Sequence, residues 1–228
     1  MANTSGGIVV RRNLLVLIAL FITSLTASNL TASKLVFLGR VGGVTLLTPA
    51  AVVAYAATFL FTDIISEVWG KKIAGQVVFA GFISQLLLIF LVNLAIILPV
   101  APFQGSEFQE AYARILGPSW YIVVGGLIAY LVSQYHDVWA FHMWREKTKG
   151  KWLWLRNNAS TMVSQLIDTV IFITLAFAIL PQVALGSPII PWNNLPGLIL
   201  GQYIVKLIIA LLDTPFCYLG VYLVGEKN

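Results

Sequence analysis

Charged residues are scarce in this sequence. They make up 10% of its 228 residues, while hydrophobic residues make up 59% and the mean hydropathy is +0.88. A soluble domain carries about 25% charged residues, so the deficit excludes an ordinary soluble protein and predicts an integral membrane protein. The basic residues that give the net charge of +5 lie mainly between the apolar runs. The charge therefore indicates membrane orientation, and no nucleic-acid partner is predicted.

Cysteine and histidine are also scarce, and the sequence has no nucleotide-binding motif. The single cysteine, Cys217, excludes an intrachain disulfide. His136 and His142 are six residues apart, which is not the i,i+4 spacing of helical metal ligands, so no metal site or cofactor is predicted. The sequence has no P-loop, which excludes ATP hydrolysis by this chain, and no G-x-S-x-G elbow or histidine cluster that would favour an enzyme.

What the sequence does have is a series of long apolar runs. Each transmembrane helix needs about 20 apolar residues, so about six fit. Strands of a membrane barrel would alternate over about ten residues, and these runs are continuous. The sequence therefore predicts an all-α membrane protein with a single transmembrane domain, residues 1–228, with a turn at 39–43 and a polar loop at 99–118. The predicted spans are 13–33, 47–68, 73–98, 119–144, 157–180 and 195–224.

The basic residues are distributed unequally between the two sides of these spans. Lysine and arginine are retained on the cytoplasmic side of a membrane. One side carries ten of them and the other carries three, Lys34, Arg40 and Arg114. The ten are Arg11, Arg12, Lys71, Lys72, Arg145, Lys147, Lys149, Lys151, Arg156 and Lys227. We therefore expect both termini to be cytoplasmic, in the cell (inner or plasma) membrane, with the lipid bilayer as a partner.

Polar residues interrupt two of the apolar runs in the same way. Residues 156–174 contain Ser164, Gln165 and Asp168, and the preceding span repeats the Ser-Gln-x-x-Asp pattern with Gln134 and Asp137. A carboxylate inside a membrane span is a candidate functional residue. Glutamine and aspartate three residues apart share one helix face. Both acids fall at similar depth on neighbouring antiparallel helices, so the pattern predicts a polar pocket between the fourth and fifth spans. The alternative is that these residues only tie helices together.

Other charged residues have functional and structural interpretations that the sequence leaves open. Glu67 could bind solute, or pair with Lys71 at a solvated helix end. Lys34 could face the site, or extend to the outer interface. Lys206 and Asp213 are seven residues apart in the sixth span. They could neutralise each other, neutralise Asp168, or carry protons, which makes them the ion-coupling candidates.

Three segments together resemble one transporter family. They are T-D-I-I-S-E-V-W-G (62–70), N-x-x-x-S-K (29–34) and W-L-R-N-N-A-S-T-M-V-S-Q-L-I-D-T (154–169). In order and spacing they are similar to the vitamin-uptake or queuosine-precursor transporters of bacteria and archaea. The segment Leu47-Thr48-Pro49 departs from the family by lacking a phenylalanine next to the proline.

The resemblance implies a function and a site. It implies six helices, a likeness to the substrate-binding subunits of energy-coupling-factor transporters, and uptake of a 7-deazaguanine precursor of queuosine without an ATPase. The expected substrate-binding residues are Asn29, Lys34, Glu67, Gln134, Asp137, Gln165 and Asp168. The sequence leaves open whether the protein forms a homodimer. The alternatives are a binding subunit that needs a separate ATPase module, a membrane-embedded enzyme, and a scaffold subunit.

Overall fold

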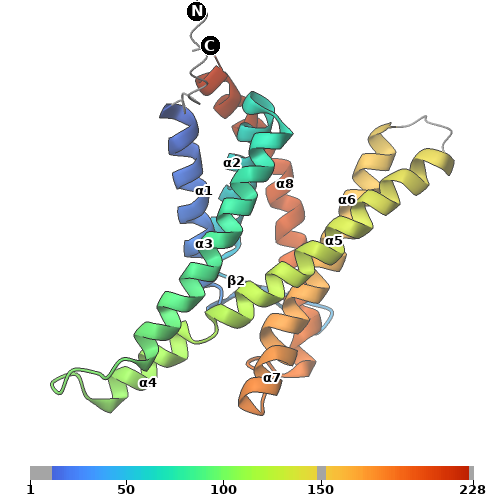
Figure 1. The fold of residues 1–228 in the computed structure, drawn as a ribbon. Helices are drawn as coiled ribbons and strands as arrows, with labels where there is room; N and C mark the ends of the chain where they lie inside the picture. The colour runs from blue at the N-terminus through green and yellow to red at the C-terminus, as the bar shows by residue number, and fades with distance from the viewer. Residues whose placement is uncertain (1–11, 148–152, 226–228) are drawn as a thin grey trace, which may run out of the picture.

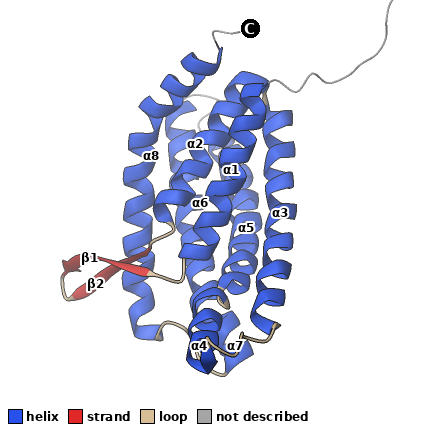
Figure 2. Ribbon diagram, turned by 90° about the vertical axis from the view of Figure 1, so that its left-hand side faces the viewer, coloured by secondary structure: helices blue, strands red, loops and turns tan. Residues whose placement is uncertain are grey.

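The computed structural model describes residues 12–147 and 153–225 (Figure 1). The chain forms a helical bundle with one β-hairpin, in agreement with the predicted all-α membrane class (Figure 2). The helices are α1 (Arg12–Thr31), α2 (Val52–Trp69), α3 (Lys71–Ile97), α4 (Gly105–Leu116), α5 (Ser119–Lys147), α6 (Leu153–Thr174), the π-helix η1 (Leu175–Ile179), α7 (Leu180–Leu185), the 3-10 helix η2 (Trp192–Asn194) and α8 (Leu195–Gly225). The strands are β1 (Leu35–Val41) and β2 (Val44–Pro49).

Five segments of the described chain are long and apolar enough to cross a membrane, judged by length and composition. They are Arg12–Thr31, Val52–Trp69, Lys72–Ile97, Gly105–Ser133 and Met162–Leu185. The range predicted for the sixth span forms α8, of which Pro215–Val224 is a shorter apolar stretch. That α8 is a sixth membrane span therefore stays a prediction.

A β-hairpin lies between α1 and α2, where the sequence predicted only a turn and then a helix. Strands β1 and β2 pair antiparallel, with Leu35 opposite Pro49 and Val41 opposite Val44. Gly42 and Gly43 have positive φ angles of 55° and 84° and form the turn. The span predicted from residue 47 begins instead at Val52. The β-branched and leucine-rich run before Pro49 favours a strand.

A short helix replaces the polar loop predicted for residues 99–118. In α4, Phe108, Tyr112 and Ile115 recur at helical spacing, while Glu110 lies on the opposite face. Its low overall hydropathy hides this periodicity from a search for apolar runs. Gln109 donates a hydrogen bond of 2.6 Å from Nε2 to the backbone carbonyl of Ile96 on α3, which fixes α4 against the end of that helix.

The helices run alternately between two ends of the bundle. Helix α1 begins and α8 ends at the same end, which we call the terminal end; α4 and α7 lie at the opposite, distal end (Figure 1). At the terminal end, α5 and α6 lean away from α2, α3 and α8 (Figure 1). Helix α6 passes through the π-turn of η1 into α7, which ends at Gly186 with φ 78°.

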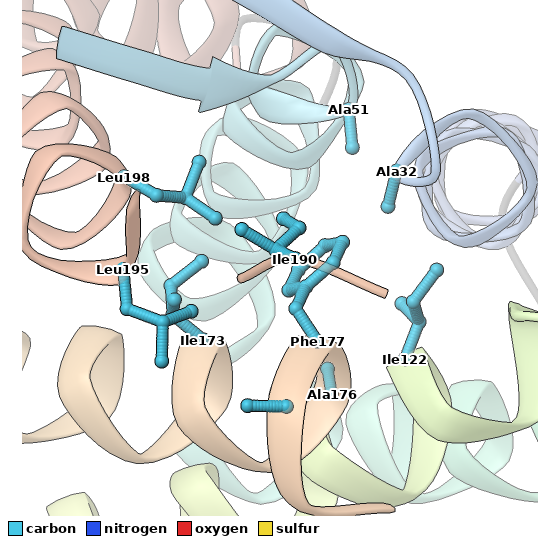
Figure 3. Packing of buried hydrophobic residues seen from close by; sticks show 10 residues of the cluster. Ala32, Ala51, Ile122, Ile173, Ala176, Phe177, Ile190, Leu195 and Leu198 are labelled. Atoms are coloured by element: carbon cyan, nitrogen blue, oxygen red, sulfur yellow. The ribbon is translucent and has the colours of Figure 1, made fainter. Parts of the chain in front are cut away.

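Two apolar clusters hold the bundle together. The distal cluster joins the end of α1, the start of α2, α5, η1 and the start of α8 around Phe177 (Figure 3). Its buried members are Ala32, Ala51, Ile122, Ile173, Ala176, Phe177, Ala178, Ile190, Leu195 and Leu198. The terminal cluster joins α1, α2 and α3 through Leu17, Phe21, Ile64, Ile65, Ala74 and Val77. The polar residues described below lie on the terminal side of the distal cluster.

Candidate functional site

An ion pair lies between α6 and α8 inside the bundle. Lys206 Nζ is 2.6 Å from Asp168 Oδ2, and the two side chains are only 8% and 17% exposed. A buried ion pair gains little net stability, because each charge loses its hydration. Its presence in the apolar part of a membrane protein therefore makes the pair a functional candidate. Of the three interpretations of Lys206, the structure shows the contact in which it neutralises Asp168, and its role in carrying protons stays a prediction.

An aromatic ring lies next to this pair. The Tyr55 ring centroid on α2 is 5.9 Å from Lys206 Nζ, within the range of a cation–π contact. Helices α6, α8 and α2 therefore each contribute a charged or aromatic side chain to one region.

The depth of this region follows from its position relative to the distal cluster. On α2, Tyr55 lies four residues after Ala51, about 6 Å along the helix. On α8, Lys206 lies eight residues after Leu198, about 12 Å toward the terminal end. On α6, which runs the other way, Asp168 precedes Ile173 by about 7 Å. The distal cluster thus separates the polar region from the distal end of the bundle.

Asn29 lies at a similar depth, but its side chain is engaged between α1 and α3. Its Nδ2 donates a 2.7 Å hydrogen bond to Gln85 Oε1, and Gln85 Nε2 lies 3.5 Å from Thr26 Oγ1. Gln85 is only 3% exposed. The structure therefore gives Asn29 a helix-linking contact, and a role in substrate binding stays a prediction.

Two predicted site residues lie away from the ion pair. The Lys34 side chain is exposed at the base of the hairpin, where its backbone carbonyl accepts a hydrogen bond from Ala50 N. Glu67 is exposed near the end of α2, twelve residues beyond Tyr55 and about 18 Å along the helix. The structure does not bring these two residues together with Asp168.

The two segments with the repeated Ser-Gln-x-x-Asp pattern do lie side by side. His136 Nδ1 of α5 is 3.0 Å from Ser164 Oγ of α6. Gln165 is partly buried. The side chains of Gln134, Asp137 and Asp213 lie outside the described residues, although their backbones belong to α5 and α8. Asp168 itself faces α8, so the site that the structure shows lies between α6, α8 and α2 rather than between α5 and α6 alone.

Sequence reasoning missed three residues of this region: Tyr55, Gln85 and Gln202. Gln85 follows a serine, as Gln134 and Gln165 do, so the Ser-Gln pattern could have found it. Gln202 lies four residues before Lys206 in an apolar run, and the argument applied to Gln165 and Asp168 would have found it. Tyr55 carries no comparable signal, because an isolated tyrosine in an apolar helix is common.

Comparison with known proteins identifies the family of this chain. Residues 49–220 match the family described as "Putative vitamin uptake transporter". This chain belongs to that family. It is therefore a multi-pass membrane protein of a transporter family, as its apolar helices also indicate.

Two curated relatives are similar over much of the chain. The "Probable queuosine precursor transporter" of Bacillus subtilis (strain 168) is 32% identical over 73% of this chain and 68% of that protein. The "Queuosine precursor transporter" of Escherichia coli (strain K12) is 29% identical over 52% of this chain and 50% of that protein. No solved structure matches this chain.

Proposed function

We propose that this protein takes up a queuosine precursor, a 7-deazaguanine such as the 7-cyano or 7-aminomethyl compound or queuine, and that it does so as a carrier without its own ATPase or any catalytic step. The observation that carries the proposal is the buried Asp168–Lys206 pair beside the Tyr55 ring. The names of both relatives support the same solute class.

The chemistry of the three side chains matches that solute. A guanine-like edge presents N1–H and an exocyclic amine, and one carboxylate accepts hydrogen bonds from both. An aromatic face such as Tyr55 stabilises a flat base by stacking, worth about 1–3 kcal/mol. Lys206 neutralises Asp168, so the site carries no isolated buried charge.

The other predicted residues take supporting positions in this proposal. Gln165 and, from α5, Gln134 and Asp137 would form the wall on the α5 side of Asp168. Asn29 would hold the α1–α3 side through Gln85. Lys34 and Glu67 lie toward opposite ends of the bundle, so we assign them to the path of the solute. Lys206 and Asp213 on α8 are the ion-coupling candidates.

Uptake of radiolabelled 7-aminomethyl-7-deazaguanine tests the proposal. The host cells should lack their own precursor transporter and any energy-coupling-factor module. Expression of the wild-type chain should restore uptake, and Asp168→Ala should not. Uptake that appears only when such a module is co-expressed would instead make the chain a binding subunit. Adding a protonophore to the same assay should stop uptake if a proton gradient drives it.

A further inference from the structure

Gln202 is a buried amide for which the described part of the chain provides no hydrogen bond. The residue is 6% exposed, and its Oε1 is fully enclosed without a partner. Most buried polar side chains in proteins have a partner, and an unsatisfied one destabilises the folded state. A buried glutamine that remains unpaired in the protein therefore needs an explanation.

The position of Gln202 connects it to the ion pair. It lies one helical turn before Lys206 and one turn after Leu198, and residues four apart share a helix face. Gln202 therefore lies between the distal cluster and the Lys206–Asp168 pair. Asp168 contacts Lys206 through Oδ2, and among the described residues its other oxygen, Oδ1, has no hydrogen bond.

A close backbone contact fixes the rotation of α8 at this point. A Cβ atom placed on Gly201 would lie 2.1 Å from the carbonyl oxygen of Leu47, so only glycine lets β2 approach this closely. The residues next to this contact are Gln202 on the helix and Thr48 on the strand. Thr48 is 2% exposed, and within the described ranges its hydroxyl also has no partner. Two unpaired polar groups thus flank one rigid contact.

Gln85 shows what a structural glutamine looks like in the same bundle. It is as deeply buried as Gln202, but its oxygen accepts from Asn29 at 2.7 Å and its nitrogen lies 3.5 Å from Thr26 Oγ1. A glutamine that links helices is therefore paired in this protein. Gln202 differs from it in that respect.

We propose that Gln202 is a solute-binding residue whose amide recognises the carbonyl-bearing edge of a flat heterocycle held at Asp168. Its Nε2 donates to the ring carbonyl oxygen, while Asp168 accepts from the adjacent ring N–H and the amine. Its Oε1 accepts from a donor on the substituent next to that carbonyl. The inference rests on the proposed function. It adds the residue that distinguishes a ring with a carbonyl from one without it.

Binding and melting of purified Gln202→Leu test the inference, with Gln85→Leu as the matched control. The probes are 7-aminomethyl-7-deazaguanine and its 6-thio analogue, which keeps the ring N1–H but replaces the carbonyl oxygen with sulfur, a weaker acceptor. The wild type should bind the analogue about tenfold more weakly than the parent compound, because a buried donor loses its oxygen acceptor. Gln202→Leu should bind the parent compound weakly by a similar factor and should no longer distinguish the two probes.

The solute-free melting temperatures separate a binding role from a structural one. Gln202→Leu removes an unpaired polar group, so its melting temperature should equal or exceed that of the wild type. Gln85→Leu should melt lower, because it leaves Asn29 without its acceptor. A lower melting temperature for Gln202→Leu, or full discrimination between the probes by this variant, would overturn the inference alone. Failure of the wild type to bind the parent compound would overturn the proposed function and this inference together.

Discussion

Lys206 and Asp168 lie 38 residues apart in the sequence and meet at 2.6 Å between Nζ and Oδ2, joining α8 to α6 within the bundle. Tyr203, one turn earlier on α8, donates a second link through a 3.2 Å hydrogen bond from its hydroxyl to the backbone carbonyl of Met162. The two helices are therefore fixed to each other by polar contacts. The solute site that we propose lies where the Lys206–Asp168 pair meets the Tyr55 ring.

The stability of this pair can be measured by a mutant cycle. Lys206→Met or Asp168→Leu alone leaves one buried charge without a partner, which destabilises a protein by about 3–5 kcal/mol. The double variant contains two apolar side chains, so it should be more stable than either single variant and close to the wild type. Thermal melts of the four purified proteins in one detergent check this. If the single variants melt at the same temperature as the wild type, neither charge needs the other for the stability of the protein.

Asp168→Asn separates binding from packing at the same position. Asparagine can still accept a hydrogen bond from Lys206, so the protein should fold, but it no longer offers the solute a carboxylate. A hydrogen bond to a charged group is worth about 1.5–3 kcal/mol, so affinity for the 7-deazaguanine should fall roughly 10- to 150-fold. Titration calorimetry and a thermal melt on the same preparation provide the measurement. Unchanged affinity in a less stable protein would make Asp168 a helix-linking residue.

The sequence identified the individual polar residues of the site better than their partners. Charged side chains such as Asp168 and Lys206 are energetically unfavourable in an apolar run, so each could be selected from sequence alone. Their pairing depends on how α6 and α8 rotate against each other. Contacts distant in the chain set that rotation, such as Gly201 against Leu47. The same limit applies to Asn29, whose acceptor Gln85 is 56 residues away.

The fold also contains parts that the sequence pattern predicted and parts that it missed. Long apolar runs predicted the positions of most membrane helices to within a few residues. The β-hairpin and α4 were missed because both are amphipathic or short, so neither forms a continuous apolar run. Phe108 and Ile115 of α4 are exposed in this structure, and their helical spacing rather than their number is the signal.

Gly201→Ala tests the close contact between α8 and β2. The added methyl group would lie 2.1 Å from the Leu47 carbonyl oxygen, and overpacking of this kind destabilises proteins by about 1–3 kcal/mol. Gly75→Ala on α3 is the matched control, because its Cβ would meet no atom within 4 Å and alanine favours a helix. Gly201→Ala should lower the melting temperature, and Gly75→Ala should keep or raise it. Equal melting temperatures would show that β2 moves aside without loss.

The orientation of the bundle can be read by cysteine labelling in intact cells. In a Cys217→Ser background, we introduce Gly150→Cys, in the sequence between α5 and α6, or Ser106→Cys, on α4 at the distal end. The ten-to-three excess of basic residues predicts that the terminal end is in the cytoplasm. A membrane-impermeant maleimide should therefore label Ser106→Cys directly, and Gly150→Cys only after permeabilisation. Labelling of Gly150→Cys from outside would reverse the orientation, and it would also move the exposed Glu67 end of α2 to the outer face.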